Sequence, residues 1–224
     1  MRSLFITIEG GEGSGKTTQL KALLDHLRSG GRKVAETRDP GGTAIGNQIR
    51  DILLDGQNAR MDFLTELLLY EASRAQLVQE IIRPALEAGQ VILCDRFTDS
   101  TVAYQGYGRG LDLDLIGRLN AVAAGGIRPD LTFLLDLDPV VGLERAQGRM
   151  ASSRASRDRL EDEALAFHER VRQGFRSLAA TETERVVVLD AVQSLSELAA
   201  EIRRRVDARL GPTETAPGMR RRST

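Results

Sequence analysis

Cysteine is almost absent from this chain of 224 residues, and Cys94 is the only one. A single cysteine cannot form an intramolecular disulfide, and a zinc site built from thiolates needs more than one. Cys94 also ends the apolar run 91–94, which favours a core position over a nucleophile. The simplest setting for such a chain is the reducing cytoplasm.

A charge excess of one sign and long apolar runs are also lacking. The chain has 31 basic and 32 acidic residues, a formal net charge of −1, so no overall field attracts nucleic acid or a membrane. No apolar run approaches the roughly 20 residues that span a bilayer, and no basic-then-apolar signal segment opens the chain. We expect a soluble protein that binds neither nucleic acid nor membranes.

What the chain does contain is a glycine-rich stretch over residues 10–18, GGEGSGKTT. It fits G-x-x-x-x-G-K-[ST], the phosphate-binding loop, whose backbone N–H groups curl around phosphate oxygens. Lys16 adds a mobile positive charge, and the hydroxyl of Thr17 is suited to bind Mg²⁺. An apolar run precedes the loop and a helical pattern follows it, as such a loop requires. The stretch therefore predicts a nucleotide-phosphate site.

Short apolar runs alternate with helical patterns along the chain. The apolar runs lie at 4–8, 33–37, 91–94, 131–137 and 185–189. The helical patterns lie near 17–29, 43–54, 62–88, 112–124, 139–148, 158–180 and 194–209. This order predicts an α/β fold with a five-stranded parallel sheet and helices on both faces, in one domain over 1–210. Residues 211–224 lack apolar periodicity and are expected to form a disordered tail.

Ligands of such sheets bind beyond the carboxyl ends of the strands, and polar residues follow the predicted ends. Asp95 and Arg96 follow the third run, where a carboxylate suits Mg²⁺ and a guanidinium fits phosphate oxygens. A surface ion pair is the alternative for these two residues. The turn 38–43, RDPGGT, either approaches a substrate or is only a turn with a helix cap at Thr43.

Two segments carry side chains suited to a base and a sugar. Tyr70 and Arg74 lie one helical turn apart on the same face, where a ring can stack on a base and a guanidinium can bond its edge. By spacing alone, a core tyrosine beside a solvated arginine fits better. The segment 100–106 adds the hydroxyl and amide groups of Thr101, Tyr104 and Gln105.

Arginines gather in a segment of small residues at about 145–160. They are Arg145, Arg149, Arg154, Arg157 and Arg159. Phosphoryl transfer needs positive charge at the transferring group and exclusion of water, which a closing lid provides. A solvated helix face paired with the acidic residues 161–163 is the alternative. His26 and His168 lie outside these segments and are interpreted as surface or packing residues.

Together, the phosphate loop, the turn 38–43, the Tyr70 segment, Asp95-Arg96-Phe97 and the segment 100–106 resemble the thymidylate kinase family over about residues 3–200. The resemblance implies a P-loop NTPase fold and transfer of the γ-phosphate of ATP to dTMP with Mg²⁺. It also implies a cytoplasmic homodimer, formed through helices such as 62–88. The implied ATP-binding residues are Gly10, Gly11, Glu12, Gly13, Ser14, Gly15, Lys16, Thr17 and Thr18. The implied dTMP-binding residues are Glu12, Asp39, Pro40, Arg50, Tyr70, Arg74, Arg96, Thr101, Tyr104 and Gln105.

The resemblance also assigns roles. Lys16 and Arg96 are catalytic, Asp95 is catalytic and holds the metal with Thr17, and Arg50 joins Arg96 on the dTMP phosphate. Tyr70 stacks on thymine, Arg74 lies at the thymine edge with Thr101 beside it, and Tyr104 lies near the deoxyribose. Glu12, facing the sugar 3′-hydroxyl, stands where other members carry a loop arginine. The chain thus resembles the bacterial type that takes catalytic arginines from the lid, here Arg149 and Arg154. Asp39 departs from the glutamate that is more usual in the family.

Two other functions share part of this pattern. Another P-loop nucleoside monophosphate or deoxynucleoside kinase has the same loop, although Arg50 and Arg96 favour an acceptor that already bears a phosphate. A P-loop switch that hydrolyses nucleotide slowly also has the loop, although the guanine-reading N-K-x-D pattern is missing from this chain.

Overall fold

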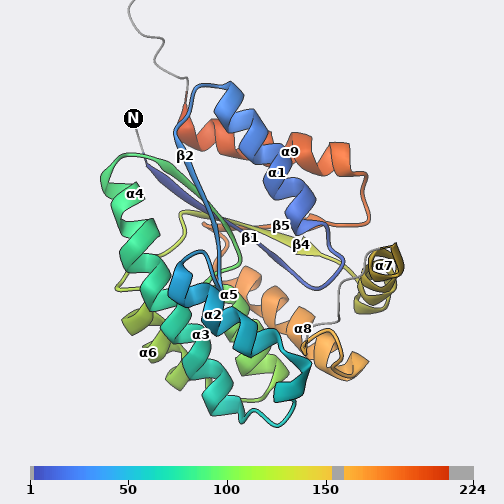
Figure 1. The fold of residues 1–224 in the computed structure, drawn as a ribbon. Coiled ribbons are helices and arrows are strands. Elements are labelled where there is room, and N and C mark those ends of the chain that lie inside the picture. The colour runs from blue at the N-terminus through green and yellow to red at the C-terminus, as the bar shows by residue number, and fades with distance from the viewer. Residues whose placement is uncertain (1–2, 153–158, 212–224) are drawn as a thin grey trace, which may run out of the picture.

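The computed structural model describes residues 3–152 and 159–211, which form a parallel sheet between two layers of helices (Figure 1). The strands are β1 (Leu4–Gly10), β2 (Val34–Arg38), β3 (Val91–Asp95), β4 (Leu131–Asp136) and β5 (Val186–Asp190). Their order across the five-stranded sheet is β2-β3-β1-β4-β5. The predicted strands and the predicted sheet are confirmed, with only small shifts at the strand ends.

The central strand β1 is covered on both faces. It pairs in parallel with β3 and β4, so that Ile6 stands in register with Leu93 on one side and Leu131 on the other. Side chains alternate across a strand, so Leu4, Ile6 and Ile8 belong to one core cluster and Phe5 to another. Such burial explains the nearly continuous apolar run in the sequence.

One face of the sheet is covered by α1 (Lys16–Ser29) and α9 (Leu195–Leu210), which lie side by side (Figure 1). Leu23 and Leu27 of α1 pack in the same core cluster as Ile202 and Val206 of α9. Because α1 starts directly after the phosphate loop, this packing fixes the loop against the end of β1.

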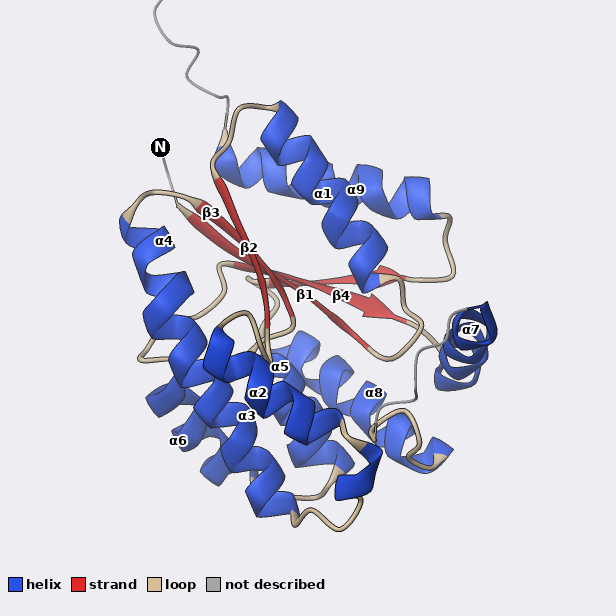
Figure 2. Ribbon diagram, in the orientation of Figure 1, coloured by secondary structure: helices blue, strands red, loops and turns tan. Residues whose placement is uncertain are grey.

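The opposite face carries most of the remaining helices (Figure 2). They are α3 (Phe63–Leu77), α4 (Arg83–Glu87), α6 (Leu113–Ala123) and α8 (Leu165–Thr181), with α2 (Ala44–Leu54) packed on α3. A π-helical turn, η2 (Val78–Ile82), joins α3 to α4, so the helix predicted at 62–88 is one continuous rod. The short α5 (Thr98–Thr101) likewise continues into the π-helical segment η3 (Val102–Gly108).

The helix cap that the sequence offered at Thr43 is confirmed, and α7 also has a capped start. The hydroxyl of Thr43 accepts a hydrogen bond from the Gly46 N–H at 2.9 Å and caps α2. α7 (Pro139–Ser152) begins with proline at its first position, and Asp138 accepts from the N–H of Val140 at 3.0 Å.

The helix predicted at 158–180 starts later than expected. The helix α8 begins only at Leu165, because residues 159–164 form turns. The N–H of Arg159 bonds to the carbonyl oxygen of Leu54 at 3.1 Å instead of belonging to the helix. The other predicted helices are confirmed at nearly their predicted bounds.

Cys94 is fully buried in β3, as expected for a core residue. His26 lies at the surface beside Asp207, and His168 packs edge-on against Phe167. The prediction that the histidines are surface or packing residues is therefore confirmed. No helix in the described ranges is long and apolar enough to cross a bilayer. Tail residues 212–224 lie outside the described ranges.

Candidate active site

The segments that follow β1, β2 and β3 line a cavity of about 330 Å³ at the carboxyl edge of the sheet. Each position that the sequence placed in the dTMP site is among its lining residues. The loop residues from Glu12 to Thr18 and the strand-end residue Asp95 line the same cavity. Gly10 and Gly11 are not among the lining residues. The cavity therefore brings together segments that are far apart in the sequence.

The phosphate loop depends on glycine backbone geometry. Gly13 has a φ of 68°, and a Cβ there would lie 2.1 Å from the carbonyl oxygen of Gly142. Only glycine fits such a place. α1 begins at Lys16, so the free N–H groups of its first turn lie at the cavity, where they favour an anion.

Lys16 is folded back onto the loop. Its Nζ donates to the carbonyl oxygen of Gly11 at 2.8 Å and to that of Gly10 at 3.2 Å. Burial lowers the pKa of Lys16, and the charge of Arg96 adds to that effect. A phosphate oxygen is a stronger hydrogen-bond partner for an ammonium group than either of these carbonyl oxygens. A phosphate bound in the loop would therefore draw Nζ of Lys16 away from them.

Arg96, Glu12 and Tyr104 form one set of contacts across the cavity. Arg96 has a φ of 68°, the one positive φ of a non-glycine residue in the described ranges. Its Nη2 lies 2.9 Å from Oε1 of Glu12, and its guanidinium lies 5.0 Å from the centre of the Tyr104 ring. The Tyr104 hydroxyl donates to the same Glu12 oxygen at 3.0 Å. Arg96 is thus a cavity residue paired with Glu12, and the alternative of a surface ion pair with Asp95 is wrong.

The charge state of Glu12 follows from these neighbours. Burial acts to raise the pKa of Glu12, but Lys16, Arg96 and the Tyr104 hydroxyl outweigh it and hold the pKa at about 2. Glu12 is therefore ionised at neutral pH. In that state it can accept a hydrogen bond from a hydroxyl group of a ligand as well as from Tyr104.

Asp95 and Thr17 offer oxygen atoms to the same cavity. Oδ1 of Asp95 is buried without a hydrogen-bond partner among the described residues, an arrangement that a cation would satisfy. No cluster of three or more acidic, histidine or cysteine side chains in the described ranges could hold a metal by itself. One carboxylate and one hydroxyl suit Mg²⁺, which keeps waters and takes its other ligands from substrate phosphates.

Arg74 lines the cavity and is almost fully buried. Its Nε donates to Asp39 at 2.6 Å, its Nη1 to Glu71 at 2.9 Å and its Nη2 to Thr101 at 2.7 Å. Asn120 accepts a further bond from Nη1 at 2.6 Å. The alternative of a solvated Arg74 is therefore wrong. Asp39 is the residue that holds its Nε.

Comparison with known proteins shows the family to which the chain belongs. The sequence model of the family described as Thymidylate kinase matches residues 8–202. The chain is 55% identical to a thymidylate kinase of Solidesulfovibrio magneticus over 201 residues, which cover 89% of this chain and 96% of that protein. It is 56% identical to one of Geobacter sulfurreducens over 199 residues, 88% of this chain and 93% of that protein. The chain belongs to the thymidylate kinase family.

A solved structure supports the same assignment. The crystal structure of thymidylate kinase from Ehrlichia chaffeensis superposes with a TM-score of 0.74 and 34% sequence identity, covering 92% of this chain and 99% of that one. The P-loop NTPase fold is thereby confirmed, and the protein is a nucleoside monophosphate kinase.

The arginines of the segment 145–160 lie in different environments. Arg145 donates to the carbonyl oxygen of Ala191 at 3.2 Å. Arg159 is buried, its Nε donates to the carbonyl oxygen of Leu53 at 3.1 Å, and its Nη2 pairs with Glu66. Assigning Arg159 to a mobile lid was therefore wrong, because its charge is neutralised inside the protein. The side chain of Arg149, at the end of α7, and the whole of Arg154 and Arg157 lie outside the described residues.

Sequence reasoning missed Glu66, a fully buried acid on α3. Its carboxylate accepts hydrogen bonds from Gln105 at 2.8 Å and from Arg109 at 3.1 Å, and it pairs with Arg159. The segment 62–88 reads as an amphipathic helix in which an acidic residue is unremarkable. The partners are 39 to 93 positions away, so no local pattern reveals them.

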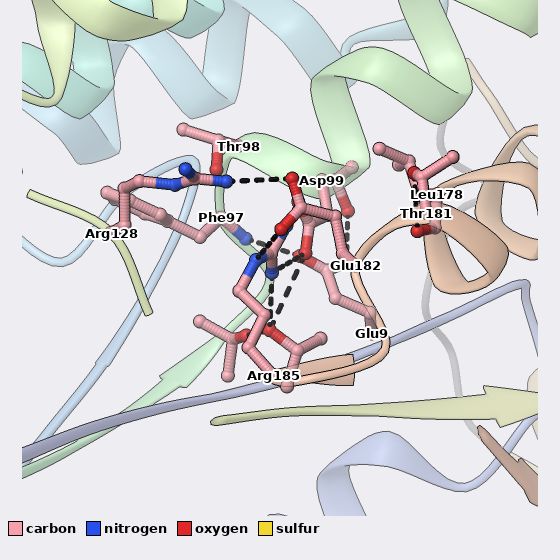
Figure 3. A network of polar contacts seen from close by, with 12 residues as sticks. Glu9, Phe97, Thr98, Asp99, Arg128, Leu178, Thr181, Glu182 and Arg185 are labelled. Carbon is pink, nitrogen blue, oxygen red and sulfur yellow. Dashed lines mark hydrogen bonds and ion pairs between the residues drawn. The ribbon is translucent and has the colours of Figure 1, made fainter. Parts of the chain in front are cut away.

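The sequence places Glu9, the residue before the first loop glycine, among the polar residues after the first strand but indicates no role for it. Its Oε1 accepts from the N–H of Phe97 at 2.7 Å and its Oε2 from the hydroxyl of Ser100 at 2.6 Å. Figure 3 shows Glu9 near Asp99, which Arg185 holds with two bonds of 2.7 and 2.9 Å. Burial, and then the negative charge of Asp99, raise the pKa of Glu9 to about 8. In the sequence, the only sign of this buried site is that an acidic residue directly follows the apolar run 4–8.

Proposed function

We infer that the protein transfers the γ-phosphate of ATP to dTMP, giving dTDP and ADP. The observation that carries this inference is that a phosphate loop and the Tyr70, Arg74 and Arg96 side chains line one cavity. Such a cavity can hold a donor phosphate and a phosphate-bearing acceptor next to each other. Membership of the thymidylate kinase family supplies the identities of the two substrates.

The donor is assigned to the loop side of the cavity. The loop residues 10–18 bind the phosphates of ATP through backbone N–H groups, and Lys16 leaves the carbonyl oxygens of Gly10 and Gly11 to bind them. Thr17 and Asp95 would hold Mg²⁺, which neutralises charge on the phosphates when it is bound. The buried, unpartnered Oδ1 of Asp95 supports this assignment.

The acceptor is assigned to the far side of the cavity. Arg96 and Arg50 bind the phosphate of dTMP, Tyr70 stacks on thymine, and Arg74, Thr101 and Gln105 read its edge. Tyr104 lies against the deoxyribose, where its bulk disfavours a 2′-hydroxyl, and Glu12 accepts from the 3′-hydroxyl. Asp39 holds Arg74 in place, and Pro40 holds Arg50 through its carbonyl oxygen at 3.1 Å.

The reaction is an in-line phosphoryl transfer. The attacking phosphate oxygen of dTMP is already anionic, so no strong general base is needed, and catalysis consists of positioning and charge neutralisation. Lys16 and Arg96 contribute the positive charge that the described residues provide. Because Glu12 occupies the loop position of an arginine, we assign the remaining charge to Arg149 and Arg154.

We further propose that the protein is a cytoplasmic homodimer. Large apolar side chains on α2 and α3, which pack on each other, are about half exposed, and a partner surface would remove them from water. These residues, which we call the α2–α3 patch, are Ile45, Ile52, Phe63, Leu64 and Leu68. A second copy of the same patch would cover them around a two-fold axis.

A coupled assay of ADP release tests the activity. With ATP and Mg²⁺ we expect rapid ADP formation with dTMP, slower formation with dUMP, and little with dCMP, dGMP or thymidine. A nucleoside kinase would prefer thymidine, and a slow nucleotide switch would release ADP at the same rate without any acceptor. Either of those outcomes would overturn the proposal.

A further inference from the structure

Glu66 connects the wall of the cavity to the interior of the protein. Its Oε1 accepts from Gln105 Nε2 at 2.8 Å and from Arg109 Nε at 3.1 Å. Its Oε2 accepts from Arg109 Nη2 at 3.1 Å and pairs with Arg159. Burial acts to raise the pKa of Glu66, but the hydrogen bonds from Arg109 and Gln105 outweigh it and lower the pKa. Glu66 is thus a carboxylate, and a carboxylate can only accept hydrogen bonds.

That restriction decides which way the amide of Gln105 points. Turning the amide over would bring its oxygen against the carboxylate of Glu66, with no hydrogen between them. The NH₂ group is therefore committed to Glu66, and the carbonyl oxygen Oε1 is the group that Gln105 keeps for a ligand. Gln105 lines the cavity, so the cavity presents a hydrogen-bond acceptor at this position.

The second group at this end of the cavity has the opposite polarity. Arg74 lines the same cavity and carries only donors, and the longest of its bonds is that of Nη2 to the carbonyl oxygen of Phe97 at 3.5 Å, which a ligand acceptor can replace. A donor and an acceptor that line one cavity match the edge of a pyrimidine that has a carbonyl oxygen at position 4 and an N–H at position 3. Cytosine offers the reverse, an amino group at position 4 and an acceptor at N3.

We infer that Glu66 is a positioning residue which fixes the amide of Gln105 and thereby sets the preference for a base with N–H at position 3. The inference rests on the proposed function, because it names what selects the base in that same site. Glu66 acts through Gln105 and touches no substrate itself.

The isosteric variant Glu66→Gln tests the inference. The new NH₂ group can take the place of either carboxylate oxygen. In the place of Oε2 it would face two arginines, which are only donors. In the place of Oε1 it would face Gln105 and one arginine, so this second arrangement is favoured. Gln105 then turns over to accept from it and presents NH₂ to the cavity. We expect KM for dTMP to rise about tenfold or more, with the dTMP to dCMP ratio of kcat/KM falling by at least as much.

Arg109→Lys is the matched control. It weakens the same buried cluster but leaves the carboxylate of Glu66 in place, so it should lower Tm while keeping the dTMP to dCMP ratio close to that of the wild type. Gln105→Leu removes the reading group and should also lower the ratio. An unchanged ratio in either Glu66→Gln or Gln105→Leu would overturn the inference, while wild-type activity on dTMP would still stand.

A measurement on the wild-type protein does not depend on the folding of any variant at position 66. The side-chain N–H signals of Gln105, identified by their loss in Gln105→Leu, should include a proton that exchanges with solvent about a hundredfold more slowly than in exposed glutamines. Exchange at the exposed rate would mean that the NH₂ group is not bound to Glu66, which would also overturn the inference. Absence of wild-type activity with dTMP would instead count against the proposed function.

Discussion

Arg96 and Glu12 are 84 positions apart in the sequence, yet Nη2 of one lies 2.9 Å from Oε1 of the other. The same guanidinium donates to the carbonyl oxygen of Gly10 at 2.9 Å and to the hydroxyl of Ser100 at 3.2 Å. The phosphate loop and the strand end after β3 are therefore one unit. The arginine that we propose binds the acceptor phosphate is therefore held by the loop that we propose binds the donor.

Lys16→Ala is expected to lower kcat by about a hundredfold or more, because it removes positive charge that stabilises the transition state. The fold should remain, since the side chain bonds only to loop carbonyl oxygens among the described residues. Steady-state kinetics with dTMP, together with circular dichroism, measure the two effects. Lys21→Ala, on an exposed position of α1, is the matched control and should behave as the wild type. Near-normal turnover of Lys16→Ala would contradict the assignment.

Glu12 makes stability depend on acid. Its folded pKa of about 2 lies below the usual 4.5, so its contribution to stability is present above pH 4.5 and is lost as the pH falls towards 2. We expect urea unfolding of the wild type to lose more free energy between about pH 5 and pH 2.5 than that of Glu12→Gln. Parallel pH dependence of the two proteins would show that Arg96 and Lys16 do not hold this carboxylate.

Glu9 should have the opposite effect. Its folded pKa of about 8 lies above 4.5, so the folded state binds the proton more tightly, and stability falls as the pH rises from about 4.5 through 8. In Glu9→Gln this fall should be smaller, by on the order of a few kcal/mol between about pH 5 and pH 8.5. Asp99→Asn should reduce it less, because it removes only the second cause of the shift. Equal slopes for wild type and Glu9→Gln in urea unfolding would refute the raised pKa.

The α2–α3 patch should control assembly. Leu68→Glu places a charge among the half-exposed apolar residues and is expected to shift the protein from dimer to monomer in sedimentation velocity. Val188→Glu, which charges a similarly exposed position on the edge strand β5, is the control and should leave the dimer intact. A wild-type protein that sediments as a monomer at micromolar concentration would contradict the proposed homodimer.

Much of the fold could be predicted because its signals are local. The strands are apolar runs that two layers of helices bury, and the glycine spacing of residues 10–15 encodes the loop directly. The cavity could be predicted because parallel strands bring their carboxyl ends to one edge. The start of α8 could not, since the bonds that Arg159 makes to residues near position 54 and to Glu66 are not visible in the residues around it.

The buried acids show where such prediction ends. Glu9, Glu66 and Asp99 each draw their environment from residues that only the folded chain brings near. The same holds for Arg74, whose spacing from Tyr70 gave its helix face but not its burial among Asp39, Glu71 and Asn120. Helical spacing determines the direction of a side chain, while the elements packed against it determine its charge and its hydrogen bonds.

The position of β1 in the middle of the sheet has a consequence for synthesis on the ribosome. Both neighbours of β1 are made long after it, and Thr7 of β1 bonds to Thr132 of β4, 125 positions later. At about 5 to 20 residues per second, the first strand waits about 6 to 25 seconds for its second neighbour. The phosphate loop, although encoded at the start of the chain, is thus among the last parts of the nascent protein to acquire its final surroundings.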